Sequence, residues 1–298
     1  MRKLFLYFGL IFFLVVSCQG VSGVKSDSNK QQMNDVHQET IQNQGENNFI
    51  QPISSDLKKV ERTEQFKNGV SITWIEEGKG EVINEGEVVL IDFKVTLNDG
   101  RVIDGNHLLK KKMIPFMVGF NMQTKGWDFA FTKLKVGDYV NVKIPGNLAR
   151  GEHGIKKDGE SGWFVPPNSE NFLTVKVIEK MKPIREIDGV KVWVFEENKN
   201  NQEIFGEGKA IVFHTMISTK SNPYYYNSYR ERDPYTMYLT DKGIVPGLKK
   251  SLLGAKKADR MLVFVPANQG YGDKGLLGMV KPNEDLFYNI LVLDVRDK

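Results

Sequence analysis

Cysteine is almost absent from this chain, whose 298 residues include only one, Cys18. A single cysteine excludes a disulfide within the chain and any metal site that needs several cysteine ligands. An excess of charge is also missing, because 41 Lys and Arg against 37 Asp and Glu give a net charge of only +4. The sequence therefore predicts neither a nucleic-acid partner nor a polybasic membrane surface.

Histidine is scarce as well, and its positions do not favour a metal site. His37, His107, His153 and His214 lie far apart, and none has a close His or Cys companion. The AspGly carboxylate at 99–100 belongs to a turn sequence and not to a paired-carboxylate hydrolytic site. We therefore expect no metal and no cofactor. The length of 298 residues and the ordinary content of 40% hydrophobic residues predict a globular protein of two domains.

The only long hydrophobic run lies at the N-terminus, where it follows Arg2 and Lys3 and ends just before Cys18. This is the pattern of a secretory signal, and the run is shorter than the ~20 residues of a typical transmembrane helix. Residues 15–18 (ValValSerCys) resemble the lipobox of bacterial lipoproteins, with Val15 in place of the usual leucine. The resemblance implies a signal peptide at 1–17 and a lipid on Cys18. The alternative is a plain signal peptide with an incidental cysteine.

A change of composition follows the hydrophobic run. Residues 19–57 are rich in Gln, Asn, Ser, Asp, Gly and Lys and show no hydrophobic period. Such a segment buries too little apolar surface to offset the entropy lost on ordering. We therefore expect a lipidated N-terminus and flexible tether over residues 18–60.

The rest of the chain contains an internal repeat with an offset of about 120 residues. Residues 69–72 (GlyValSerIle) match residues 189–192 (GlyValLysVal), and residues 145–151 (ProGlyAsnLeuAlaArgGly) match residues 266–272 (ProAlaAsnGlnGlyTyrGly). We expect two similar domains, at 61–181 and 182–298. Their junction is predicted near Pro183, because proline cannot continue a central strand.

Each copy combines strands with one short helix. Residues 88–97, 138–144 and 260–265 alternate apolar and polar side chains and are predicted strands. The GlyTrp pair at 126–127 and the GlyLeu pair at 247–248 each begin an apolar spacing of i, i+3, i+4, i+7, which is typical of a helix packed on a core. The predicted fold class is α+β, with an antiparallel sheet and one short helix in each domain.

The order of motifs in both copies is similar to that of FK506-binding-protein-type (FKBP) peptidyl-prolyl isomerase domains. The first copy contains AspGlyArgValIleAsp (99–104) and LysGlyTrp (125–127), and the second contains IleValProGlyLeu (244–248) and TyrGlyAspLysGly (271–275). The resemblance implies a half-wrapped sheet whose apolar pocket accepts proline. The barrier to rotation of a peptide bond is ~18–20 kcal/mol, and lowering it requires no nucleophile, metal or cofactor.

For the second copy, the resemblance implies a complete set of pocket residues. Tyr271, Val245 and Tyr226 are the expected catalytic residues, with the Tyr271 hydroxyl and the Val245 N–H as donors to substrate carbonyls. The other expected substrate-binding positions are Tyr235, Met237, Ile244, Leu248, Val280, Tyr288 and Asn227. Three residues depart from the family pattern: Asn227 replaces an aspartate, Leu248 replaces a tryptophan and Thr215 replaces a tyrosine.

The first copy departs from the family in other positions. It keeps Phe93, Asp104, Phe116 and Trp127 as expected pocket residues. Family residues are replaced by Arg150 at the tyrosine donor, by Ile103 and Leu173 at aromatic walls, and by Gln123 and Thr124 beside the floor. Arg150 is either a ligand for an acidic peptide group or a solvated residue at the rim. We do not expect ordinary isomerase activity from this copy.

The expected function is a peptidyl-prolyl isomerase anchored through Cys18 to the cell envelope, facing the periplasm or the cell surface. Its expected partners are proline-containing segments of exported proteins. The alternative is a non-catalytic chaperone or assembly module that keeps the fold to hold peptides. Tyr271 and the motif at 244–248 favour the enzyme, whereas Asn227 and Arg150 favour the alternative.

Overall fold

The computed structural model describes residues 62–157, 161–197, 199, 203–223 and 225–297. The predicted signal peptide, the lipidation site at Cys18 and the tether through residue 60 lie outside the described residues. Within the described ranges, no helix has the length and apolar character needed to cross a membrane.

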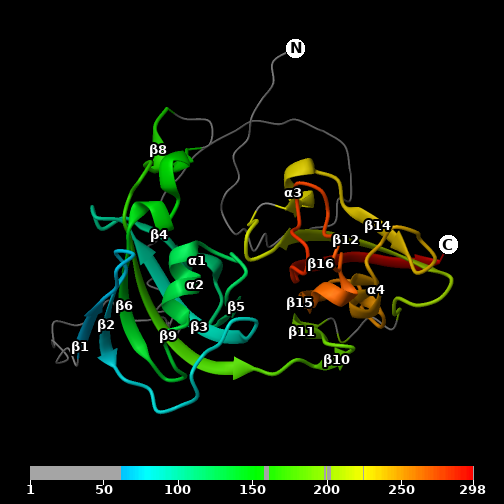
Figure 1. Ribbon diagram of the computed structural model, residues 1–298, viewed down its shortest axis with the longest axis horizontal. Helices are drawn as coiled ribbons and strands as arrows, with labels where there is room; N and C mark the ends of the chain where they lie inside the picture. Colours follow the sequence, from blue (N-terminus) through cyan, green and yellow to red (C-terminus); the bar gives the residue numbers. More distant parts are fainter. Residues whose placement is uncertain (1–61, 158–160, 198, 200–202, 224, 298) are drawn as a thin grey trace, which may run out of the picture. The chain divides into compact units, whose positions relative to one another are not determined.

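The first domain is an antiparallel sheet with short helices (Figure 1). Its strands lie in the order β1-β2-β6-β9-β3-β4, and β5 pairs with β3. The elements are β1 (Arg62–Gln65), β2 (Ser71–Glu76), β3 (Val88–Thr96), β4 (Val102–Gly105), α1 (Asn106–Leu109), β5 (Ile114–Met117), α2 (Lys125–Phe131), β6 (Tyr139–Ile144), β7 (Ile155–Lys156), β8 (Trp163–Val165) and β9 (Asn171–Met181).

The second domain repeats this topology. Its strands lie in the order β10-β11-β15-β16-β12-β13, and β14 pairs with β12. The elements are β10 (Arg185–Ile187), β11 (Val190–Glu196), β12 (Lys209–Ser218), β13 (Tyr226–Asn227), α3 (Ser228–Glu231), β14 (Tyr235–Tyr238), α4 (Pro246–Leu252), β15 (Arg260–Val265), η3 (Ala267–Gln269) and β16 (Leu286–Asp297). The predicted α+β class with two tandem domains is confirmed.

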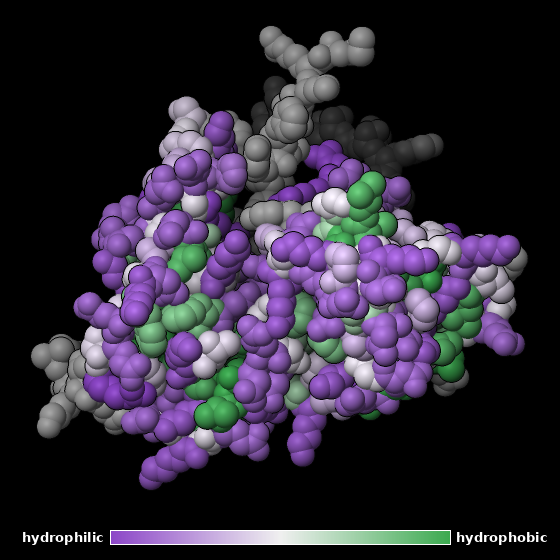
Figure 2. All heavy atoms as spheres, in the orientation of Figure 1, coloured by the Kyte–Doolittle hydropathy of each residue, from purple (hydrophilic) through white to green (hydrophobic). Residues whose placement is uncertain are grey.

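Alternation of side chains explains which face of each sheet forms the core. In β6, Val140, Val142 and Ile144 are buried, whereas Asn141 and Lys143 between them are exposed. Successive side chains of a strand point to opposite faces, so one face collects the apolar residues. On the side of the molecule drawn in Figure 2, the described surface is mostly hydrophilic, and hydrophobic residues occur in small separate groups.

One helix in each domain packs closely against a strand because it carries a glycine at the contact. A Cβ on Gly126 of α2 would lie 2.3 Å from Cγ2 of Ile144 on β6. A Cβ on Gly247 of α4 would lie 2.3 Å from Cγ1 of Val265 on β15. Any side chain at these positions would push the start of the helix away from the sheet.

Two further helices were not expected from the sequence. α1 and α3 each have only four residues, which is too short to show a helical period. Asn227 begins α3, because its side-chain oxygen accepts a hydrogen bond from the Tyr229 N–H at 3.0 Å. A left-handed residue, Arg232, with φ of 56°, ends the same turn. Asn227 is therefore an N-cap.

Buried carboxylates hold the loops of the first domain. Asp138 accepts hydrogen bonds from Trp74 Nε1 at 3.1 Å, the Gly78 N–H at 2.7 Å and the Lys135 N–H at 3.0 Å. These bonds connect β2, the loop that follows it and the turn before β6. Because buried donors need a partner, this carboxylate holds β2 and the turn before β6 together.

Asp128 joins α2 to the loop after β5 in the same way. Its carboxylate accepts hydrogen bonds from the Gly119 N–H at 2.9 Å and the Asn121 N–H at 2.7 Å. Burial nevertheless raises the pKa of Asp128 to about 6, because the loss of hydration outweighs these two bonds.

The glycine contact predicts the effect of Gly247→Ala. Alanine is the better helix former by about 1 kcal/mol, but overpacking against Val265 costs roughly 1–3 kcal/mol. We therefore expect urea unfolding of the full chain to show a net loss of stability. Gly206→Ala is the matched control, because a Cβ there meets no atom within 4 Å and its φ is not positive. If Gly247→Ala and Gly206→Ala had the same free energy of unfolding, the close contact between Gly247 and Val265 would be contradicted.

The raised pKa of Asp128 predicts a pH dependence of stability. The folded-state pKa of about 6 exceeds the ordinary value of 3.8 for an aspartate, so the folded protein binds more protons between these pH values. The contribution of Asp128 to stability is full at low pH and is lost as the pH rises through 6. Between pH 4 and pH 6, we expect the free energy of unfolding to fall less in Asp128→Asn than in the unmodified protein. The exposed Asp273→Asn is the control, and an unchanged slope in Asp128→Asn would contradict the assignment.

Candidate functional site

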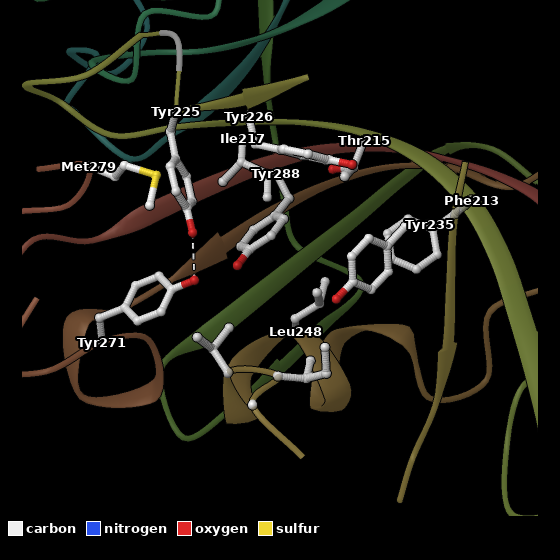
Figure 3. A pocket seen from close by; sticks show the side chains of 13 residues that line it. Phe213, Thr215, Ile217, Tyr225, Tyr226, Tyr235, Leu248, Tyr271, Met279 and Tyr288 are labelled. Atoms are coloured by element: carbon white, nitrogen blue, oxygen red, sulfur yellow. Dashed lines mark hydrogen bonds between the residues drawn. The ribbon is translucent and has the colours of Figure 1, made fainter. Parts of the chain in front are cut away.

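The second domain contains a pocket with a volume of about 270 Å³ (Figure 3). Its walls are mainly aromatic and aliphatic, with hydroxyl groups at their edges. The lining residues are Phe213, Thr215, Ile217, Tyr225, Tyr226, Tyr235, Gly243, Ile244, Val245, Leu248, Tyr271, Met279 and Tyr288. A concave apolar site with a few polar groups is the usual form of a binding pocket for a small apolar group.

Alternation along β12 and the start of α4 supply much of the lining. Phe213, Thr215 and Ile217 are every second residue of β12 and therefore share one face of the strand. Val245 is the N-cap of α4, and Pro246 occupies the first turn, where its missing N–H costs no helical hydrogen bond. Leu248 follows one turn later and reaches the same pocket.

Tyrosines form the polar side of the pocket. The hydroxyls of Tyr225 and Tyr271 lie 2.5 Å apart and are hydrogen-bonded, and the two rings meet edge to face at a centroid distance of 6.3 Å. Figure 3 shows the two rings approaching from different segments of the chain, with their hydroxyls joined by the hydrogen bond. Burial raises the pKa of Tyr225, Tyr235 and Tyr288, because removal from water disfavours the phenolate form.

The structure brings most of the predicted residues of the second copy together. The residues that line the pocket as the family resemblance implied are Tyr226, Tyr235, Ile244, Val245, Leu248, Tyr271 and Tyr288. Met237 and Val280 lie outside this lining and pack in the hydrophobic core, where their exposed fractions are 0% and 4%. Asn227 is also outside the lining, and its side-chain oxygen caps α3.

Several lining residues were not predicted. Phe213 and Ile217 share the alternation of β12 with Thr215, so the strand pattern contains a signal for both. Met279 lies in the loop before β16, where no period indicates its direction. Tyr225 directly precedes the two-residue strand β13, which is too short for an alternation to predict the face of its neighbours.

In the first domain, the expected aromatic and aliphatic pocket residues are buried. Phe93, Phe116 and Trp127 are buried, with ring centroids 5.1 Å apart for Phe93 and Trp127 and 5.4 Å apart for Phe116 and Trp127. Ile103 and Leu173 are buried as well, with exposed fractions of 7% and 1%. The aromatic and aliphatic residues of this copy therefore pack against one another as core.

A polar chain runs across the same part of the first domain. Gln123 donates from Nε2 to the Asp104 carboxylate at 3.3 Å, and Arg150 donates from Nη2 to Gln123 Oε1 at 3.5 Å. Burial raises the pKa of Asp104, although hydrogen bonds from the Gly105 N–H and Gln123 and the charge of Arg150 oppose this rise. Arg150 thus stands where the second domain has the Tyr271 hydroxyl.

The described residues contain no group of three or more His, Cys, Asp or Glu side chains placed to hold a metal ion. The pocket of the second domain offers apolar walls, hydroxyl groups and backbone N–H groups.

Two copies of an antiparallel sheet with a short helix, one of them with an aromatic pocket at the start of that helix, define the class of FKBP domains. A family model described as FKBP-type peptidyl-prolyl cis-trans isomerase matches residues 79–178 and 202–293. These two segments make up more than half of the 298 residues, one in each domain. The chain belongs to this family.

Individual relatives share moderate identity with the chain. Human peptidyl-prolyl cis-trans isomerase FKBP10 is 25% identical over 213 residues, which are 72% of this chain and 35% of FKBP10. The chain thus spans about a third of the length of that relative. FK506-binding protein 1 of Dictyostelium discoideum is 33% identical over 112 residues, which are 37% of this chain and 96% of that protein.

Solved structures of the same class are similar at lower identity. FkpA from Escherichia coli is 24% identical, with 41% of this chain and 53% of that chain covered and a TM-score of 0.35. The three FKBP domains of wheat FKBP73 are 19% identical, with 78% of this chain and 97% of that chain covered and a TM-score of 0.38.

Proposed function

We propose that the second domain catalyses cis-trans isomerisation of peptidyl-prolyl bonds. The observation that carries this proposal is the 270 Å³ apolar pocket with the start of α4 and the Tyr271 hydroxyl in its lining. A proline ring is apolar and binds in such a pocket by the hydrophobic effect. The peptide carbonyls beside the ring need hydrogen-bond donors when water is removed from them.

The reaction requires only that the twisted amide is bound more tightly than the planar amide. Twisting removes the resonance of the peptide bond, so its carbonyl and nitrogen lose charge separation and tolerate an apolar environment better. The walls formed by Tyr226, Tyr235 and Leu248 supply that environment. The Tyr271 hydroxyl and the Val245 N–H donate to substrate carbonyls and hold the segment on either side of the rotating bond.

The first domain has a different role in this proposal. Its apolar residues are buried, and Arg150, which is linked through Gln123 to Asp104, replaces the expected tyrosine donor. A buried carboxylate and a guanidinium do not favour an uncharged proline ring. We assign this domain a supporting, non-catalytic role.

The cellular setting is the remaining part of the proposal. Residues 1–18 have the pattern of a signal peptide followed by a lipidated cysteine, and the segment through residue 60 has the composition of a tether. A lipid at Cys18 would hold the two domains at the envelope membrane. Proline-containing segments of exported proteins would then be the substrates.

A non-catalytic peptide-binding module is the second candidate function. The observation in its favour is that Asn227, in the position of a family aspartate, caps α3 and does not line the pocket. Such a module would bind proline-containing segments and leave their isomerisation rate unchanged.

Substitutions in the second domain test catalysis. We expect Tyr271→Phe to lower kcat/KM about 3- to 10-fold, because one hydrogen bond contributes about 1 kcal/mol to transition-state binding. Tyr226→Ala removes an aromatic wall and is expected to raise KM. Arg150→Ala in the first domain is the control and is expected to leave the rate unchanged. The rate is measured with the full chain and a tetrapeptide that contains a Leu-Pro bond. Equal losses from all three variants would contradict a single catalytic domain.

Lipid attachment predicts a simple change in fractionation. In cells that process lipoproteins, Cys18→Ser is expected to move the protein from the membrane pellet to the soluble fraction, because the cysteine sulfur carries the lipid. Ser17→Ala is a neighbouring control that keeps the cysteine. If Cys18→Ser stays in the membrane pellet, as the control does, the lipid anchor is wrong.

A further inference from the structure

We propose that Tyr225 is a positioning residue that directs the hydroxyl of Tyr271 toward the substrate carbonyl. This inference rests on the proposed isomerase function and extends it to a residue outside the expected set of pocket residues. It starts from the hydrogen bond between the two hydroxyls, whose oxygens are 2.5 Å apart.

The two tyrosines reach the pocket from different parts of the domain. Tyr225 precedes β13, which pairs with β12, whereas Tyr271 lies between η3 and β16. In Figure 3 the two rings extend toward each other, and the hydroxyl of Tyr225 is the group that Tyr271 meets. A tyrosine hydroxyl without a fixed partner rotates about its C–O bond, so this contact fixes the direction of the Tyr271 proton.

Each phenol has one proton, so only one of the two hydroxyls donates within the pair. The contact between the two oxygens fits donation in either direction. In the proposed arrangement the Tyr225 O–H donates to the Tyr271 oxygen. When Tyr225 donates, the proton of Tyr271 remains available to a substrate, and its O–H bond is polarised by the bond that its oxygen accepts.

Neither Thr215 nor Asn227 supplies a hydrogen-bond partner for the Tyr271 hydroxyl, which leaves this role to Tyr225. Thr215 stands where the family resemblance places a tyrosine, and its side chain is 2% exposed. Figure 3 shows Thr215 at the opposite end of the pocket from Tyr271, so β12 does not supply the partner hydroxyl. Asn227 is also occupied elsewhere, as the cap of α3. The partner of Tyr271 thus comes from the segment before β13.

Rigidity is the expected benefit for catalysis. A donor that is already oriented loses no further rotational freedom when the twisted amide forms, and its effect appears in the rate more than in ground-state binding. Loss of the Tyr225 hydroxyl should therefore lower kcat and leave KM nearly unchanged. A residue that acted only through packing would change stability and KM together.

The test is a double-mutant cycle with Tyr225→Phe, Tyr271→Phe and the double variant in the full chain. Tyr225→Phe is expected to lower kcat about 3- to 10-fold for the Leu-Pro tetrapeptide, as expected for one hydrogen bond. The double variant is expected to be no slower than Tyr271→Phe, because Tyr225 acts only through Tyr271. Tyr229→Phe is the matched control, since Tyr229 stacks on His214 and is absent from the pocket lining.

Three results would overturn the proposal. They are an unchanged kcat in Tyr225→Phe, multiplicative losses in the double variant, and a loss that appears in KM together with lowered thermal stability. If the unmodified chain does not accelerate isomerisation, the proposed catalytic function fails separately. In a chain that binds without catalysing, the Tyr271 hydroxyl can act only in the ground-state complex, so the cycle is then measured as affinity for the same peptide by calorimetry. A non-additive loss of affinity supports the positioning role. Additive losses, unchanged affinity or an absence of binding overturn it.

Discussion

The contact between α4 and β15 is the constraint on which the pocket depends. Gly247 has no side chain, and the helix therefore begins directly against Val265. This placement brings Val245 and Leu248 to the pocket from the first turn of the helix. A helix displaced by even one methyl group would move the apolar lining relative to the tyrosines of the neighbouring loops. The distance between a donor and a carbonyl tolerates only a few tenths of an ångström.

The same contact at Gly126 and Ile144 shows that fold and site are separable in this chain. Both domains keep the helix, the sheet order and the buried apolar face. In the first domain, Phe93 and Phe116 pack on Trp127 of the helix, and Asp104 and Gln123 are hydrogen-bonded to each other. The second domain keeps an open, tyrosine-lined pocket there. The two domains therefore share the scaffold and differ in the chemistry of the residues beside the helix.

Much of the fold could be predicted because it follows local patterns. Alternation predicted strands over 88–97 and 260–265, and the spacing after Gly126 and Gly247 predicted the two packed helices. The motif around Tyr271 also led to a residue that lines the pocket. Tyr225 and the capping role of Asn227 could not be predicted in this way, because both depend on a two-residue strand and a single helical turn. At that length, tertiary contacts and not periodicity decide where a side chain points.

The central claim is that the pocket of the second domain speeds rotation about a prolyl bond. Exchange between the cis and trans forms of a Leu-Pro tetrapeptide, followed by two-dimensional NMR with micromolar full-length protein, measures this directly. The uncatalysed exchange takes tens of seconds or longer at 25 °C. Our account predicts cross-peaks between the two forms at mixing times of about a second or less, where uncatalysed exchange produces none. Exchange at the uncatalysed rate would contradict the account and would leave the chain as a peptide-binding member of its family.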